Sequence, residues 1–376
     1  MIRYTKGILI LFFLLTFCTQ KSDQSKKLDY DIVSQSWQWK PFIKIDSINP
    51  ILTPSNDQVF LCPIRKETVR WEEKDVFNPA AVFRHGKIYL LYRAEDTVGK
   101  FAGTSRLGLA VSDDGLHFTK YKNPVFYPDN DLMKDFEWEG GCEDPRIVES
   151  EEGKYVLTYT AWDGKTARLA IASSNDLIHW EKHGLVLGNY KNEKYRDLWS
   201  KSGSIICKRS GNKIIATKIN DNYWMYWGDT NIYLAKSSDL ISWQPVEEDD
   251  GSLKVIFGPR KGYFDSDLVE PGPPAILTDM GIWMIYNSRN SIYKGDPDIP
   301  DGTYTAGQIL FDSNNPSNVI ARSEQNFFKP ENEYEIHGQI GNVCFLEGLV
   351  PFNNKWILYY GTADSFIAVA VFSSVN

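Results

Sequence analysis

The stretch HGKIYLLYRAED, residues 85–96, decides the fold because it recurs in loosely similar form along the chain. The further copies are EGKYVLTYTAWD (152–163), GNKIIATKIND (211–221), DMGIWMIYNSRN (279–290) and NNKWILYYGTAD (353–364). Each copy has a turn containing Gly, Asn or Lys, then an apolar and aromatic run typical of a strand, then a polar end. The sequence therefore predicts five copies of one β-structured unit.

A second predicted strand follows most of these copies and closes on a recurring turn. The turn has a serine, a short polar run, a leucine and an aromatic residue, and it occurs at 112–118, 173–180 and 237–243. After the leader, no stretch of about ten residues has clear helical periodicity. Repeats made only of strands favour an all-β, five-bladed β-propeller with a central carboxylate-rich pocket. A β-sandwich is the alternative, and the regular self-similarity argues against it.

The composition fits strands that present a sugar-binding surface. Aromatic residues make up 14% of the chain, with 12 Trp, 20 Tyr and 20 Phe, and aromatic residues favour strands. The formal net charge is −8, and no run of Lys or Arg indicates a nucleic-acid partner. The chain of 376 residues is long for one ordinary domain, but a closed β architecture can hold that length in one unit.

The N-terminus predicts export. Basic residues precede the apolar run GILILFFLLTF (7–17), which is too short to span a membrane and fits a signal peptide. Cys18 directly after it resembles a bacterial lipoprotein cleavage site, and a plain signal peptide cut slightly later is the alternative. We expect a signal peptide at 1–18, a tether at 19–40 and the catalytic propeller at 41–376. Membrane contact is then expected only through a lipid on Cys18, in the bacterial periplasm or at the outer membrane.

Four cysteines follow the leader, and their spacing matches no metal-binding motif. They are Cys62, Cys142, Cys207 and Cys344. The sequence implies neither a metal nor a cofactor. Export would permit disulfides, but nothing in the sequence pairs these residues, so we expect isolated buried thiols.

If the five copies align, their polar ends meet at one mouth of the propeller. The last residues of these ends are Asp96, Asp163, Asp221, Asn290 and Asp364, and the second residues are Arg93, Thr160, Lys218, Asn287 and Gly361. They can line a polar pocket or form ordinary turns, in which Asp and Asn are common. A pocket of carboxylates with Arg and Lys suggests cleavage of a glycosidic bond. That reaction needs an acid, and inverting hydrolysis also needs a base, whereas phosphorolysis needs cations for phosphate.

Several motifs together resemble one known family. They are FNPAAVF (77–83), YRAED (92–96), SRLGLAVSDDGLHF (105–118), GCEDPRI (141–147), YTA (159–161), PGPPAI (271–276) and YYGTAD (359–364). Their number and order are similar to glycoside hydrolase family 130, the mannoside phosphorylases and β-mannosidases. The resemblance runs from about residue 70 to the end. It implies a five-bladed propeller that acts on a mannose-containing oligosaccharide.

The resemblance also implies roles for individual residues. The Asp of the EDPR motif is the family's general acid, which relays its proton through a sugar hydroxyl, and it matches Asp144. An acid must stay protonated near neutral pH. Glu143 raises the pKa of Asp144 by repulsion and Arg146 lowers it if close, and the sequence leaves this balance open. The residues that match family positions at or around the bound mannose are Asn78, Arg93, Asp96, Ser105, Arg106 and Arg146. Turn contacts and structural ion pairs are the alternatives for each.

The chain departs from the phosphorylase pattern at the positions that would bind phosphate. Lys201, in WSKSG (199–203), can keep one cation. Lys218 stands near the family's Arg, but Lys lacks the planar fork that grips two phosphate oxygens. Asn287 stands where the family has a His. These substitutions weaken the expectation of a phosphate site, and Lys201, Asn287 and Asp364 are expected to contact substrate instead.

Two acids, Asp229 and Glu270, occur near these positions in sequence order. A carboxylate repels a phosphate dianion, by roughly 4 kcal/mol for two unit charges ~4 Å apart at an effective dielectric of about 20. We therefore predict Glu270 as the base that activates water, with Asp229 helping to hold that water. A salt bridge from Glu270 to Lys201 or Arg260, and a blade turn at Asp229, are the alternatives.

The sequence thus predicts an exported, exo-acting, inverting β-mannosidase that acts on β-1,2-linked or other β-linked mannosides. The linkage rests on the resemblance to exported hydrolytic members. A β-mannoside phosphorylase that releases α-mannose 1-phosphate is the first alternative. A glycan-binding lipoprotein without activity and an arabinan-type glycosidase are the others, because fold alone does not fix function.

Overall fold

The computed structural model describes residues 37–373. The predicted signal peptide, Cys18 and most of the predicted tether lie outside the described residues. The segment from Gln38 onward forms one compact unit. Within residues 37–373, no helix is both long enough and apolar enough to cross a membrane.

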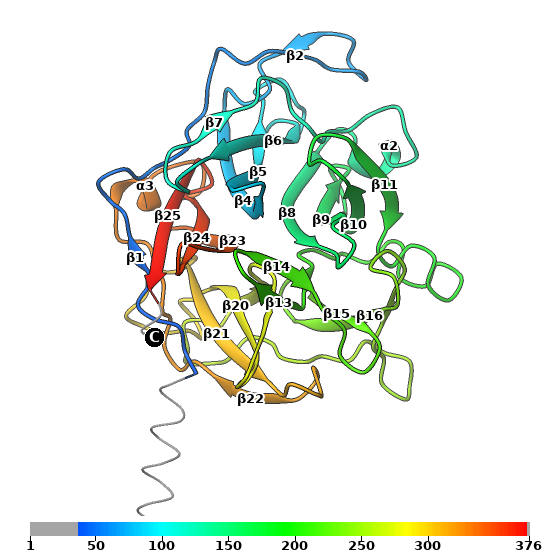
Figure 1. Cartoon of the computed structure of the whole chain (residues 1–376), viewed down its shortest axis with the longest axis vertical. Coiled ribbons are helices and arrows are strands. Elements are labelled where there is room, and N and C mark those ends of the chain that lie inside the picture. Colours follow the sequence, from blue (N-terminus) through cyan, green and yellow to red (C-terminus); the bar gives the residue numbers. More distant parts are fainter. Residues whose placement is uncertain (1–36, 374–376) are drawn as a thin grey trace, which may run out of the picture. The chain divides into compact units, whose positions relative to one another are not determined.

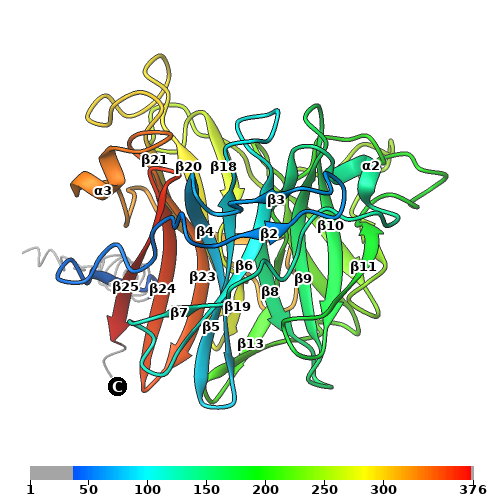
Figure 2. The same ribbon diagram turned by 90° about the horizontal axis from the view of Figure 1, so that it is seen from above.

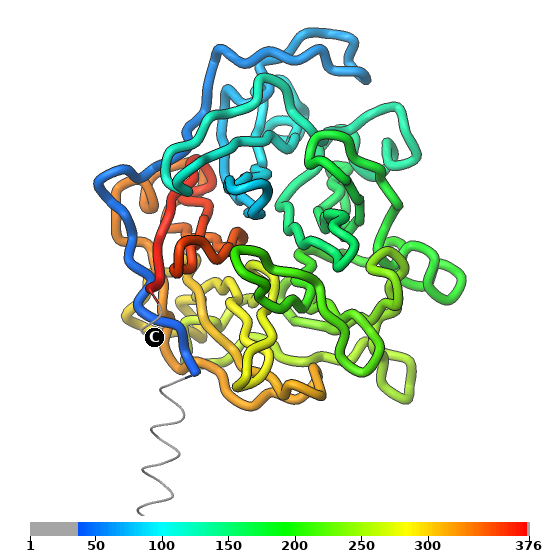
Figure 3. Tube along the Cα trace, viewed as in Figure 1, coloured from blue at the N-terminus to red at the C-terminus, as the bar shows by residue number. Residues whose placement is uncertain are grey.

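The chain is almost entirely β, as predicted, and its strands gather into five mainly antiparallel groups, here called blades, around a common centre (Figure 1). Blade 1 has β4 (Asp75–Arg84), β5 (Lys87–Glu95), β6 (Ser105–Ser112) and β7 (Thr119–Lys120). Blade 2 has β8 (Gly141–Glu149), β9 (Tyr155–Trp162), β10 (Ala167–Ser174) and β11 (Trp180–Leu185). The tube in Figure 3 follows the blades in sequence order around the ring.

The later blades have more interrupted inner strands. Blade 3 has β12 (Ser204–Ile205), β13 (Cys207–Ser210), β14 (Lys213–Ala216), β15 (Tyr223–Trp227), β16 (Tyr233–Ser237) and β17 (Trp243–Pro245). Blade 4 has β18 (Leu268–Pro271), β19 (Ile276–Thr278), β20 (Gly281–Arg289), β21 (Tyr304–Phe311) and β22 (Val319–Arg322). Blade 5 has β23 (Cys344–Phe352), β24 (Lys355–Thr362) and β25 (Phe366–Ser373).

Blade 5 takes its fourth strand from the other end of the described chain. In β1 (Ile43–Lys44), Ile43 pairs with Val371 and Lys44 with Ala370 of β25. The Asn49 side chain extends this contact, since it donates to the carbonyl of Val369 and accepts from its amide, both at 2.9 Å. The ring is therefore closed by strands from the two ends of the described chain.

Only short elements lie outside the blades. They are the hairpin of β2 (Phe60–Leu61) and β3 (Thr68–Val69), and the four-residue helices α2 (Lys134–Glu137) and α3 (Glu333–Ile336). Seen from the side in Figure 2, the blade strands run roughly alongside one another, and α2 and α3 lie toward the same end of them.

The recurring serine-leucine turn closes the third strand of a blade onto the fourth. In blade 3, Ser237 accepts hydrogen bonds from the amides of Asp239 and Leu240, and Asp239 accepts from those of Ile241 and Ser242. The Trp243 indole then donates to the carbonyl of Leu240 at 3.0 Å. The serine and aspartate bonds recur around Ser112 and Ser174, and the indole bond recurs at Trp180. These side chains satisfy turn amides that no strand partner reaches.

The core lies between the blades and consists of apolar and aromatic side chains. Between blades 5 and 1, for example, Trp71, Tyr92 and Tyr359 are buried in one cluster. The four cysteines Cys62, Cys142, Cys207 and Cys344 are buried free thiols, as the sequence predicts.

One expectation about the blades is wrong. The repeated segments, HGKIYLLYRAED and its copies, form β5, β9, β14, β20 and β24. The strands nearest the centre in Figure 1 are β4, β8, β14 and β23. In blades 1, 2 and 5 the repeat pairs with the inner strand and lies one strand away from the centre, which changes which polar ends can reach a central pocket.

Candidate active site

A pocket opens at the centre of the blades, at the end where the inner strands begin and the second strands finish. It is a hollow of about 420 Å³ including its mouth. Its polar lining residues are Asn78, Arg93, Asp144, Lys201, Glu270, Tyr304 and Asp364, and its apolar ones are Ile340, Val343 and Phe345. Six of the predicted site residues thus come together from five blades.

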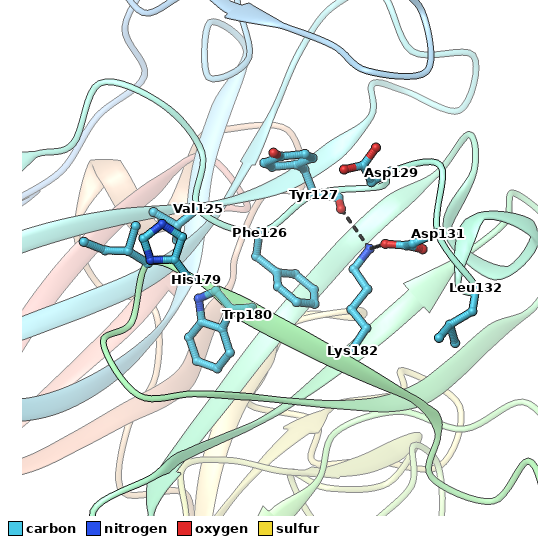
Figure 4. Close-up of a pocket in the computed structure, with 10 residues that line it drawn as sticks. Val125, Phe126, Tyr127, Asp129, Asp131, Leu132, His179, Trp180 and Lys182 are labelled. Carbon is cyan, nitrogen blue, oxygen red and sulfur yellow. Dashed lines mark hydrogen bonds and ion pairs between the residues drawn. The ribbon is translucent and has the colours of Figure 1, made fainter.

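A larger hollow, of about 830 Å³ including its mouth, lies between β11 of blade 2 and the segment before α2 (Figure 4). Lys182 lines this hollow, and its ammonium group is already bound by Asp131 at 3.0 Å and by the carbonyl of Tyr127 at 2.9 Å. Neither Asp144 nor Glu270 reaches this hollow. The central pocket is therefore the candidate active site, although it is smaller.

Two β-bulges turn the predicted acid and its neighbour into the central pocket. The pairing of β8 with β9 shifts between Glu143 and Arg146, and that of β4 with β5 shifts between Phe77 and Pro79. Asp144 has a φ of 46° and Asn78 a φ of 48°, values that only Asn, Asp and Gly adopt readily. Asn78 then donates to Asp144 Oδ1 at 2.9 Å.

Asp144 is surrounded by positive charge. Arg93 Nη1 lies 3.1 Å from its Oδ1 and Lys201 Nζ lies 3.4 Å from its Oδ2. Burial raises the pKa of Asp144, but Arg93, Lys201 and the hydrogen bond from Asn78 outweigh it, so the pKa lies below its usual range. The expected protonated acid is therefore ionised in the free protein.

The neighbouring carboxylate holds the proton instead. Burial raises the pKa of Glu143 to about 7, against the lowering effect of Arg93. Arg93 Nη2 lies 2.8 Å from Glu143 and 2.7 Å from Glu95, and Ser105 Oγ lies 3.3 Å from Glu143. Ser105 thus acts behind Arg93, outside the lining of the pocket.

Glu270 faces Asp144 across Lys201. Its side chain is buried, accepts a short hydrogen bond from Ser202 and lies 4.0 Å from Lys201 Nζ. Burial raises the pKa of Glu270, and Lys201 and Arg146 oppose this rise. The alternative partner, Arg260, binds Asp265 at 2.8 Å.

Lys201 limits the separation of the two carboxylates. Its ammonium group lies 3.4 Å from an oxygen of Asp144 and 4.0 Å from one of Glu270, and these two oxygens cannot be further apart than the sum. That upper limit is compatible with the lower part of the roughly 6.5–9.5 Å range found in inverting glycosidases. Burial lowers the pKa of Lys201, but Glu270, Asp144 and Glu143 raise it more, so it stays charged.

Asp229 stands beside this pair, half-buried at the rim. Trp199 donates its indole N–H to Asp229 Oδ2 at 2.9 Å, and Thr230 donates to Oδ1 at 3.1 Å. The Trp199 side chain is 49% exposed and packs edge-on against Trp162, with ring centroids 5.8 Å apart. This aromatic pair therefore lies beside Asp229 with one ring partly exposed.

Other predicted substrate contacts lie in the interior. Arg106 binds Asp96 at 2.6 Å, and Asp96 also accepts the amides of Thr104 and Gly99. The side chain of Asn287 accepts a hydrogen bond from the amide of Leu346 and donates one to its carbonyl. Arg146 is 1% exposed. Asp96, Arg106, Asn287 and Arg146 do not line the pocket, and their side chains bind other parts of the protein, so we place them in the scaffold around the pocket.

Most of the polar ends of the five repeats also lie outside the pocket. Of the ten polar-end positions, only Arg93 and Asp364 line the pocket. Asp163 pairs with Arg168 at 2.7 Å, and Asn290 binds the amide of Asp296 at 2.9 Å. Lys218 is exposed and lies over the ring of Tyr223. Most of these ends are therefore ordinary turns, and Lys218 is not available to a phosphate in the pocket.

Sequence reasoning missed several functional residues. Tyr304, Ile340, Val343 and Phe345 line the pocket because the third strand of blade 4 and the approach to β23 reach its mouth. Ser202, next to Lys201, binds Glu270 and could have been noticed in WSKSG. Within residues 37–373, no group of three or more His, Cys, Asp or Glu side chains is arranged to hold a metal ion.

Comparison with known proteins gives a consistent result. A glycoside hydrolase family 130 model described as β-1,4-mannooligosaccharide phosphorylase matches residues 46–375. A 1,2-β-oligomannan phosphorylase of Thermoanaerobacter sp. (strain X514) is 32% identical over 325 residues, which cover 84% of this chain and 95% of that protein. A β-1,2-mannobiose phosphorylase of Listeria innocua is 27% identical over 272 residues, covering 70% of this chain and 65% of that protein.

Solved structures are more similar. One is described with the statement that the family of mannoside phosphorylases contains glycoside hydrolases that target β-1,2 mannosidic linkages in Candida mannan. It is 46% identical, covers 91% of this chain and 96% of its own, and superimposes with a TM-score of 0.89. A glycosyl hydrolase from Bacteroides ovatus is also 46% identical, covering 90% of this chain and 96% of its own, with a TM-score of 0.87.

Proposed function

This chain belongs to glycoside hydrolase family 130, and we propose that it is the hydrolytic kind of enzyme, an exo-acting β-mannosidase that inverts the anomeric carbon. The observation that carries the proposal is Glu270, a buried carboxylate beside Lys201 in the pocket that also holds Asp144. The β-1,2 linkage is proposed from the names of the relatives, several of which act on β-1,2-linked mannose.

Asp144 supplies the proton to the leaving oxygen, directly or through a sugar hydroxyl. The free protein keeps this proton on Glu143, whose pKa is about 7. Arg93 contacts both carboxyl groups. When a proton moves from Glu143 to Asp144, the pair still carries one negative charge beside the Arg93 guanidinium. Bound sugar excludes water from the pocket and favours the neutral form of Asp144.

Glu270 acts on the opposite side of the bond. It takes a proton from a water molecule as the water oxygen attacks the anomeric carbon and the bond to the leaving oxygen breaks. The products are free mannose of inverted configuration and the shortened alcohol. Ser202 and Lys201 hold the Glu270 carboxylate in place, and Asp229 lies near enough to orient the water.

A phosphate in place of that water is disfavoured. Glu270 and Asp144 would repel the dianion by roughly 4 kcal/mol per charge pair at ~4 Å and an effective dielectric of about 20. Among the predicted phosphate-binding cations, Lys201 lines the pocket and is already shared by two carboxylates, whereas Lys218 is exposed. The solved structures that are 46% identical also bear descriptions as hydrolases.

A mannoside phosphorylase is the second candidate, favoured by the names of the curated relatives and by the presence of Lys201. The two are separated by incubating the protein with β-1,2-mannobiose with and without inorganic phosphate. The proposal expects free mannose at equal rates in both, with the α-anomer formed first. Formation of α-mannose 1-phosphate only with phosphate contradicts it, and binding without any product favours a glycan-binding protein.

We also propose export, because the sequence of residues 1–18 fits a signal peptide. Phosphorolysis conserves the energy of the glycosidic bond in a sugar phosphate, which is useful inside the cell, whereas hydrolysis forms free mannose and has no such product to lose outside it. Membrane-fraction analysis of the native chain and of Cys18→Ser tests this. Loss of membrane association in Cys18→Ser is expected, and unchanged association contradicts the lipid anchor.

A further inference from the structure

Arg146 lies beneath the pocket and joins the two segments that carry the proposed acid and base. Its Nη1 donates to the carbonyl of Asp144 at 3.1 Å. Its Nη2 donates to the carbonyl of Pro271 at 2.8 Å, and its Nε to that of Gly272 at 3.1 Å. Pro271 and Gly272 directly follow Glu270. One guanidinium thus binds the backbone of the acid and the backbone just after the base.

The geometry of the guanidinium makes this link rigid. Its donors lie in one plane with fixed angles, so the positions of three carbonyl oxygens are set together. An ammonium group in the same place would have one nitrogen and a flexible stem, and it could not reach all three. The side chain is 1% exposed, so no water competes for these bonds.

A carboxylate from a third blade balances the charge. Glu347 stands at the bulge of β23 between Leu346 and Gly348, is fully buried and lies 3.0 Å from Arg146 Nη1. Its oxygens have no hydrogen-bond partner among the described residues, so the contact is an ion pair without directional bonding. Glu347 therefore offsets the charge of Arg146 but leaves the three bonds to the backbone carbonyls in place.

We propose that Arg146 is a positioning residue that fixes the separation of Asp144 and Glu270, because one guanidinium holds the backbone of Asp144 and the backbone that directly follows Glu270. Its donors are used inside the protein, and it does not line the pocket, so it contributes no contact to the sugar. The inference rests on the proposed function, because the separation matters only if both carboxylates act on one bond. A displacement of about 1 Å between reacting groups can cost on the order of 100-fold in rate.

The test is Arg146→Lys, which keeps the positive charge opposite Glu347 and removes the planar guanidinium that binds the three carbonyl oxygens. On β-1,2-mannobiose we expect kcat to fall about 100-fold and KM to change less than threefold, because the sugar contacts remain. A fall of less than threefold in kcat overturns the proposal. So does a loss that lies mainly in KM. If the wild-type protein has no activity on this substrate, it is the proposed function that fails.

Two further variants separate positioning from stability and from charge. Arg322→Lys is the matched control, since Arg322 binds Asp265 at 2.6 Å and the carbonyl of Gly258 at 2.8 Å, away from the pocket. It should lose thermal stability yet keep kcat. Glu347→Gln removes the charge and keeps the fork, so kcat should stay within threefold. A loss in Glu347→Gln as large as in Arg146→Lys means that charge matters and overturns the proposal.

Gly272→Ala tests the link from its other end if Arg146→Lys does not fold. A Cβ at Gly272 would lie 2.9 Å from the carbonyl oxygen of Ile285 and 3.1 Å from that of Leu346, so the segment after Glu270 must shift. The proposal expects a tenfold or greater fall in kcat with KM little changed. Full kcat in a folded Gly272→Ala protein counts against it.

Discussion

Asn78 and Asp144 occupy equivalent bulges on neighbouring inner strands, and the amide of Asn78 donates to the Asp144 carboxylate at 2.9 Å. The bond fixes one oxygen of the proposed acid, while Lys201 approaches the other. The acid therefore has a single orientation, with its reactive oxygen determined by the neighbouring blade.

Asp144→Asn should lower kcat by roughly 10²–10⁴-fold on β-1,2-mannobiose, because the leaving oxygen loses its proton donor. The loss should be much smaller on 4-nitrophenyl β-mannoside, whose leaving group needs no proton. Asp163→Asn is the control, since Asp163 pairs with Arg168 outside the pocket. Equal losses on both substrates would rule out a role as acid.

Glu270→Gln should lower kcat at least 100-fold, because the amide cannot accept the proton of the attacking water. The amide keeps the shape of the side chain and its contact with Ser202. Product analysis with inorganic phosphate should be repeated on this variant, since removal of the negative charge weakens the repulsion of phosphate. A fall of less than tenfold would assign Glu270 to a salt bridge with Lys201.

The pH profile of activity should depend on Glu143. The carboxylate holds its proton up to a pH of about 7, because burial raises its pKa to that value. Glu143→Gln removes this proton and leaves Asp144, whose pKa lies below its usual range, without a protonated neighbour. The alkaline limb of kcat/KM should therefore move to lower pH in Glu143→Gln, as measured between pH 4 and 9. An unchanged limb would show that Glu143 does not supply the proton.

The pH dependence of stability should depend in part on Asp364. Burial raises its pKa from 3.8 to about 7, although Arg93 opposes this. Between these values the folded state binds one proton more than the unfolded state, so the free energy of unfolding falls as pH rises from about 4 to about 7. Chemical denaturation at pH 5 and pH 8 should show a smaller fall in Asp364→Asn than in wild type. Identical falls would contradict the raised pKa.

The fold was predictable because blade repetition is a local property. Each copy of HGKIYLLYRAED carries its own turn and apolar run, so the strand content, the blade number and the closing turns at Ser112, Ser174 and Ser237 follow from short stretches. The order of strands within a blade is not local. The repeat itself therefore does not show which strand of the blade it forms, and the structure makes it the second one in blades 1, 2 and 5.

The candidate site was also predictable only where short motifs identify its residues. Motif order identifies Asp144, Glu270, Lys201, Asn78, Arg93 and Asp364, and the structure brings these six residues together around one pocket, while their roles stay predictions. Asp96 and Arg106 do not line it, since a polar residue in a motif can serve the interior as well as a ligand, and only packing separates the two. The proton balance between Glu143 and Asp144 depends on how many cations surround each carboxylate, which no sequence pattern gives.

The pairing of β1 with β25 has a consequence for how the protein folds. The paired residues lie near opposite ends of the described chain, and Asn49 and Val369 beside them are separated by 320 positions. Contacts of such sequence separation form late, because the intervening chain must lose its freedom before they contribute. Blades 1 to 4 can form from local hairpins, but the ring closes only when the final strand is available. Ring closure is therefore expected to limit the rate of folding, and loss of β1 should accelerate unfolding because β25 would lose its outer partner.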